Sequence, residues 1–113
     1  MNYHLKAIIL KDCPYSTLAD SLIKNHKIPA EIININWNNK DKYITNEIDT
    51  FPQIYLTKKN SKGTQLLGGY TDLKYFFDTF KNQPINNNVD EFMKKYNWSR
   101  KGTLRLIQLI NFK

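Results

Sequence analysis

The amino-acid sequence predicts an α/β sandwich, in which a mixed four-stranded sheet has helices on both faces and a helical extension follows at the C-terminus. Short apolar or β-branched runs alternate with longer segments of helical spacing, in the order β-α-β-α-β-β-α. The strand–helix–strand beginning favours a parallel pair joined by a right-handed crossover. A turn cluster between the third and fourth strands favours an antiparallel hairpin at one edge of the sheet. The chain of 113 residues is long enough for one domain with an ordinary core.

The first half of the chain supplies two strands and two helices. Residues 5–10 form a short apolar run that is typical of a buried strand. Apolar side chains at helical spacing predict a helix from residue 14 to about residue 27, which stops before an Ile-Pro pair. Residues 31–36 are β-branched and predict the second strand. We expect the second helix over about residues 39–48, capped by Asn38. Its inner face would carry Tyr43, Ile44 and Ile48.

The second half begins with a β-hairpin. Residues 53–57 alternate in hydrophobicity and predict the third strand. Residues 64–67 predict its antiparallel partner, across a turn cluster at residues 59–63. Gly68-Gly69 ends the fourth strand, and Thr71 is placed to cap the helix that follows. The apolar positions of this helix recur at helical spacing and are Leu73, Phe76, Phe77 and Phe80.

Beyond a polar linker at residues 84–88, the chain carries a further helix and a basic extension. The helix is indicated by the spacing of Val89, Phe92, Met93 and Tyr96. Residues 98–113 suit a helix or a strand, and we favour a helix. The net charge of the chain is +7 and no Asp or Glu follows Glu91, so the basic excess lies at this end.

Two interpretations of this extension stay open. The one we favour is a helix packed on the domain with solvated basic side chains. The alternative is an arm that meets an acidic partner, a membrane surface or nucleic acid. Its basic residues are too few for us to expect nucleic-acid binding, and no segment is apolar and long enough to enter a membrane.

Cys13 is the only cysteine of the chain, so an intramolecular disulfide and a Cys-rich metal site are excluded. His4 and His26 show no ligand spacing, and we expect no metal. Free N–H groups and the positive end of the predicted helix favour a thiolate at Cys13. A lone cysteine is more often a buried, inert side chain. Pro14, which suits the first helical position, and the nearby Lys11 favour a reactive thiol. A reducing, cytoplasmic location fits, because no signal peptide is visible.

Three short motifs lie at the ends of predicted strands. They are Cys13-Pro14-Tyr15-Ser16 after the first strand, Thr50-Phe51-Pro52 before the third, and Gly68-Gly69-Tyr70-Thr71-Asp72-Leu73 after the fourth. Together they resemble the glutaredoxin family, within the thioredoxin fold, over roughly residues 4–96. The resemblance implies a glutaredoxin-like domain at residues 1–97 with the basic extension at residues 98–113. It also implies a monomer that takes glutathione as its cofactor.

The resemblance implies a role for each motif. Cys13 would be the catalytic nucleophile, and Pro52 would be cis and face it, leaving the Phe51 backbone free to pair with an extended peptide. The glutathione-binding set would be Lys11, Tyr15, Phe51, Pro52, Gly69, Tyr70, Thr71 and Asp72. Two positions depart from the family pattern. Lys11 stands two residues before the cysteine where the family lysine usually stands three before, and Asp49 occupies a position that is often basic. Because of these departures, we expect Lys40 or Lys42 to bind the carboxylate of glutathione.

Ser16 stands where dithiol relatives carry a second cysteine, so the resemblance implies a monothiol cycle acting on protein–glutathione mixed disulfides. Such an enzyme would serve electron transport and cell redox homeostasis, with glutathione and glutathionylated proteins as partners. One alternative is a carrier of a [2Fe–2S] cluster held by two protein thiolates and two glutathiones. Pro14 and Tyr15 resemble the redox-active branch, because cluster-binding relatives mostly carry glycine and phenylalanine there. The other alternative is a binding module with vestigial catalysis.

Overall fold

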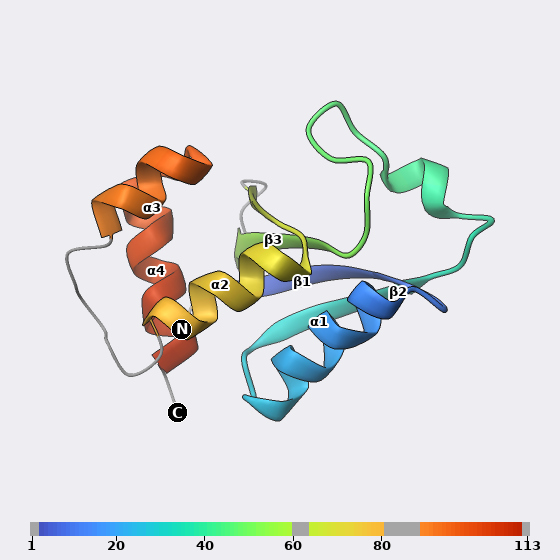
Figure 1. Cartoon of the computed structure of the whole chain (residues 1–113), viewed down its shortest axis with the longest axis horizontal. Coiled ribbons are helices and arrows are strands. Elements are labelled where there is room, and N and C mark those ends of the chain that lie inside the picture. The colour runs from blue at the N-terminus through green and yellow to red at the C-terminus, as the bar shows by residue number, and fades with distance from the viewer. Residues whose placement is uncertain (1–2, 60–63, 81–88, 112–113) are drawn as a thin grey trace.

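A computed structural model of the chain describes residues 3–59, 64–80 and 89–111 (Figure 1). The predicted linker at residues 84–88, and the predicted turn cluster apart from Lys59, lie outside the described residues. None of the helices in the described part of the chain has the length and apolar character needed to span a bilayer. The elements are β1 (Tyr3–Leu10), α1 (Pro14–Asn25), β2 (Ala30–Ile35), the 3₁₀ turn η1 (Lys40–Tyr43), β3 (Gln53–Lys58), β4 (Thr64–Gly68), α2 (Tyr70–Phe80), α3 (Val89–Tyr96) and α4 (Arg100–Asn111).

The four strands form one mixed sheet in the order β2-β1-β3-β4. β1 runs parallel to β2, with Ile8 opposite Ile33. β1 runs antiparallel to β3, and β3 runs antiparallel to β4. The parallel start, the crossover helix and the edge hairpin are therefore confirmed. β1 contributes buried side chains to the apolar clusters on both faces of the sheet, which explains its continuous apolar run.

One face of the sheet carries the main core. Successive side chains of a strand point to opposite faces, and Leu5, Ala7 and Ile9 of β1 lie on the face that α1, α2 and α4 cover. Figure 1 shows α1 and α2 side by side across this face. The aromatic rings of Phe76 and Trp98 lie 5.0 Å apart between their centroids and join α2 to the segment before α4. The helix that we favour for the C-terminal extension is confirmed, and it lies in this core.

The opposite face is built differently from the prediction. The helix expected over residues 39–48 is wrong, because this segment contains a single 3₁₀ turn, η1, which Asn39 precedes without a side-chain cap. The Asn36 side chain accepts a hydrogen bond from the Asn38 N–H, and the Thr45 hydroxyl accepts from the N–H groups of Glu47 and Ile48. These local side-chain bonds compete with the helical bonding pattern. The second face therefore has η1 and its flanking loops where a full helix was expected.

Candidate functional site

Cys13 lies at the carboxyl end of β1, where the chain turns into α1. Asp12 adopts a left-handed conformation with a φ of 63°, which allows a tight turn. Cys13 is then the N-cap residue of α1, Pro14 is the first helical residue, and the Cys13 side chain makes no capping hydrogen bond. The N–H groups at the start of a helix have no partner within the helix. Cys13 is partly exposed at this helix start.

The second motif lies directly against this thiol. The Cys13 Sγ donates a long hydrogen bond of 3.8 Å to the carbonyl oxygen of Phe51, which is 38 residues away in sequence. The peptide bond between Phe51 and Pro52 is cis, as the resemblance implied. Pro52 is fully buried directly before β3. The fold therefore places the backbone of Phe51 in contact with the Cys13 sulfur.

The third motif is a turn between β4 and α2 that glycine makes possible. Gly68 has a φ of 121°, and a Cβ at this position would collide with the Asp72 carboxylate. The Asp72 Oδ2 accepts a hydrogen bond of 3.0 Å from the Gly69 N–H, while the Gly69 carbonyl accepts from Leu73 N–H. Asp72 therefore caps α2 from its first turn. The prediction that Thr71 is the cap is wrong, because α2 begins at Tyr70 and Thr71 is already inside it.

The three motifs meet at one end of the sheet. A Cβ placed on Gly69 would lie 3.6 Å from the carbonyl oxygen of Pro52, so the two backbones are in contact. The rings of Tyr15 and Tyr70 have their centroids 6.3 Å apart. Tyr15 is 59% exposed and follows the cysteine by two residues. The Phe51-Pro52 backbone therefore lies against the partly exposed Cys13 thiol and also against the turn at Gly69.

Ser16 lies in the first turn of α1, three residues after Cys13. Its side chain is fully buried, and its Oγ accepts a hydrogen bond of 3.1 Å from the Leu10 N–H. Among the described contacts, none joins Ser16 to the Cys13 sulfur. Ser16 therefore ties the first turn of α1 to the last residue of β1.

The lysines that sequence reasoning assigned to glutathione lie elsewhere around the Cys13 loop. The Lys11 side chain is exposed and lines a cavity of about 490 Å³ beside β2. The Lys40 Nζ lies 4.5 Å from the centre of the exposed Trp37 ring, and Lys42 lines a smaller cavity on the opposite face of the sheet. Within the part of the chain that the structure describes, no hydrogen bond or ion pair links these lysines to Cys13.

Tyr96 of α3 is a residue near the site that sequence reasoning missed. Burial raises the pKa of the Tyr96 hydroxyl above its ordinary value, and the negative charge of Asp72, together with a hydrogen bond to it, raises this pKa further. The contact joins α3 to the turn that carries the third motif. Tyr96 and Asp72 are far apart in sequence and belong to different helices, so no local pattern could have indicated this pair.

His4, one of the two histidines, has an ordinary polar partner. Its Nε2 lies 2.9 Å from the Thr57 hydroxyl on the neighbouring strand. Within residues 3–59, 64–80 and 89–111, no three His, Cys, Asp or Glu side chains gather so as to hold a metal ion.

Comparisons with known proteins support the fold. No protein-family model matches the chain, and no curated protein sequence matches it either. Among solved structures, the chain is similar to a crystal structure of glutaredoxin 1 from Francisella tularensis complexed with cacodylate. The TM-score is 0.56 and the sequence identity is 22%, over 72% of this chain and 99% of that chain. At this level of identity the likeness shows the fold, which is the thioredoxin-like α/β fold of a glutaredoxin.

Proposed function

We propose that the protein is a glutathione-dependent thiol–disulfide oxidoreductase that uses Cys13 alone to reduce protein–glutathione mixed disulfides. The observation that carries this proposal is the convergence of Cys13, the Phe51 backbone and the turn at Gly69. Each lies at a different point of the sequence, and together they form a thiol with a backbone edge beside it. The likeness of the fold to a glutaredoxin supports the same conclusion.

Glutathione would lie along this edge. An extended peptide can pair with free backbone groups as an added strand does, and Phe51 offers such groups beside the sulfur. The γ-glutamyl carboxylate would bind the N–H groups of Tyr70 and Thr71, because the start of a helix attracts anions. Asp72 holds the Gly69 N–H, and a carboxylate can accept several hydrogen bonds, so it can also meet the α-amino group.

Lys11 would act on glutathione through its charge. It is exposed beside the Cys13 loop, where it attracts the glycyl carboxylate without a fixed ion pair. Such an exposed charge contributes modestly, on the order of 1 kcal/mol or less. Tyr15 and Tyr70 would form the wall of the groove on the α1 and α2 sides.

The reaction comprises two thiol–disulfide exchanges. The Cys13 thiolate attacks the glutathione sulfur of the mixed disulfide, a new S–S bond forms, the old one breaks, and the substrate protein leaves as a thiolate that takes up a proton. A second glutathione thiolate then attacks the glutathione sulfur held on Cys13. Oxidised glutathione leaves and the Cys13 thiolate returns. The net reaction consumes one reduced glutathione: the protein–glutathione disulfide becomes a protein thiol, and the glutathione that the substrate carried leaves as half of the oxidised glutathione.

The test is a coupled assay that follows oxidised glutathione with glutathione reductase and NADPH. The substrate is a small glutathionylated disulfide, and the matched control is Ser21→Ala on the exposed side of α1. We expect Cys13→Ser to abolish turnover and Ser21→Ala to retain it. Mass spectrometry after exposure to oxidised glutathione should show one adduct, on Cys13, that reduced glutathione removes. Full activity of Cys13→Ser would exclude the proposal.

We further propose that the protein works as a monomer in the reducing cytoplasm, with glutathionylated proteins as its substrates.

A further inference from the structure

The Asp72 carboxylate, in the turn of the third motif, has hydrogen-bond donors from two different parts of the fold. Its Oδ2 accepts the Gly69 N–H at 3.0 Å, and the carboxylate also accepts a hydrogen bond from the hydroxyl of Tyr96, which belongs to α3. Asp72 is a partly exposed residue. A carboxylate offers about four lone-pair sites to donors, so it can keep both of these bonds and accept a further donor from a ligand.

The Tyr96 ring is held by aromatic packing. It stacks on the Trp98 ring, with 4.8 Å between the centroids and 22° between the planes. It also stacks on the Phe92 ring, with 5.7 Å between the centroids. Phe92 and Trp98 are themselves buried in the main core. Because close-packed side chains have few rotamers open to them, these contacts fix the position from which the Tyr96 hydroxyl donates to Asp72.

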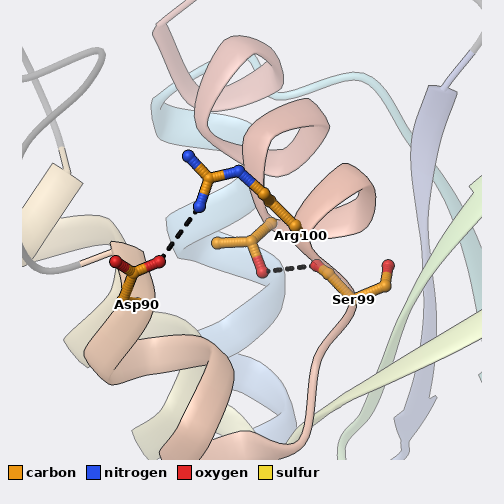
Figure 2. A network of polar contacts seen from close by, with 4 residues as sticks. Asp90, Ser99 and Arg100 are labelled. Carbon is orange, nitrogen blue, oxygen red and sulfur yellow. Dashed lines mark hydrogen bonds and ion pairs between the residues drawn. The ribbon is translucent and has the colours of Figure 1, made fainter.

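The helix that carries Tyr96 is also tied to α4. The Asp90 Oδ1 of α3 lies 3.0 Å from the Arg100 Nη1 of α4, and Figure 2 shows this ion pair beside Ser99. The Ser99 carbonyl accepts a hydrogen bond from the Thr103 hydroxyl at 2.8 Å, within the first turn of α4. An exposed ion pair contributes little by itself, so the buried rings provide most of the anchoring. α3 is therefore packed as part of the domain, with its last residue at the turn of the third motif.

We propose that Tyr96 is a positioning residue for glutathione, because its hydroxyl orients the Asp72 carboxylate that meets the α-amino group of the γ-glutamyl end. This inference rests on the proposed function. A carboxylate that is oriented before the ligand arrives loses less conformational freedom on binding, which strengthens the contact. Since Tyr96 acts on the amino group of the ligand through Asp72, it stabilises the glutathione adduct of Cys13 without taking part in the exchange of sulfur bonds.

The equilibrium between the full-length protein and oxidised glutathione tests the proposal. In this exchange the Cys13 thiolate forms a disulfide with one half of oxidised glutathione and displaces the other half as a glutathione thiolate. Mass spectrometry gives the fraction of adduct at each ratio of reduced to oxidised glutathione. Tyr96→Phe keeps the stacked ring and removes the hydroxyl, and it should lower the equilibrium constant about fivefold. The matched control Tyr3→Phe removes a hydroxyl from the first residue of β1, and its constant should equal that of the parent.

A second probe, the oxidised form of N-acetylglutathione, separates positioning from a structural role because it lacks the α-amino charge. With this probe, the parent and Tyr96→Phe should give the same constant. With glutathione, Tyr96→Phe should cause no further loss once Asp72→Asn is present.

Three outcomes would overturn the inference. An equal loss with both probes would mean that the Tyr96 hydroxyl only supports the fold. An unchanged constant for Tyr96→Phe with glutathione would mean that Asp72 needs no help from Tyr96. A parent protein that forms no adduct with oxidised glutathione would overturn the proposed function and this inference with it, whereas the first two outcomes leave the proposed function intact.

Discussion

Replacing Ser16 with alanine should separate stability from catalysis. The Ser16 side chain is 0% exposed, and its Oγ is the acceptor for the Leu10 N–H at 3.1 Å. In Ser16→Ala this buried N–H loses its acceptor, while the shape of the core changes little. Leaving a buried donor unpaired costs about 1–3 kcal/mol. For a chain of this size, that cost corresponds to a fall in Tm of roughly 4–15 °C.

The rate of glutathione-dependent turnover should change little in this variant, because the Ser16 contact is with β1 and not with the Cys13 sulfur. Urea unfolding gives the stability, and the coupled assay gives kcat/KM at a temperature where both proteins are folded. Ser21→Ala, on the exposed side of the same helix, is the control for a general loss of helix stability. We expect it to unfold near the urea midpoint of the parent protein.

Two outcomes would refute this reasoning. An unchanged free energy of unfolding would mean that the Leu10 N–H does not depend on Ser16. A loss of turnover by tenfold or more in a variant that remains folded would mean that Ser16 acts on the thiol itself.

Ser16→Cys adds a second thiol at the position where dithiol relatives carry one, and direct reduction of a protein disulfide without glutathione should then appear.

Three further predictions concern the turn at the third motif and the base of α4. Gly68→Ala should raise the KM for glutathione, because alanine is strained at a φ of 121° and its Cβ would collide with Asp72, so the turn must shift. An unchanged KM would contradict the role of this turn in binding glutathione. Ultraviolet titration should show the pKa of Tyr96 above the ordinary value, and Asp72→Asn should lower it, because the negative charge and its hydrogen bond are removed. Since the raised pKa makes the folded state bind the Tyr96 proton more tightly, its contribution to stability is present below about pH 10 and is lost as the pH rises through the folded pKa; Tyr96→Phe should flatten this loss. Gly102→Ala places a Cβ where the Gln65 oxygen lies, but that oxygen is the end of a flexible side chain and alanine is the better helix former, so urea unfolding should show a change of about 1 kcal/mol or less.

The order of the elements could be predicted because the spacing of apolar residues is a local property. Leu73, Phe76, Phe77 and Phe80 repeat with the helical period, and all four are buried in α2. The helix predicted over residues 39–48 was wrong because the conformation of this segment depends on which side chains accept hydrogen bonds from its backbone N–H groups. Thr45 accepts hydrogen bonds from two N–H groups that follow it, and the apolar pattern does not report such competition.

The candidate site could be assembled from the sequence only through a resemblance to a family. Nothing local relates Cys13 to Phe51, which lies 38 residues away and contacts the sulfur through its backbone. The spacing of apolar residues likewise could not predict the hydrogen bond between Gln65 and Ser99, which are 34 residues apart. The capping error at Thr71 has a local cause. A hydroxyl at the cap and a carboxylate in the first turn both suit a helix start, and the position of Gly69 decided in favour of Asp72.

The burial of α4 bears on the two interpretations of the C-terminal extension. Leu106, Ile107 and Leu109 are 0% exposed and Ile110 is 4% exposed. Burying four such side chains stabilises by roughly 6–12 kcal/mol in total, which is comparable to the whole stability of a small domain, about 5–15 kcal/mol. An arm that left the domain to capture a partner would give up this stabilisation. Recognition by the extension must therefore use the outer face of α4, where Lys101 remains exposed while the helix stays packed.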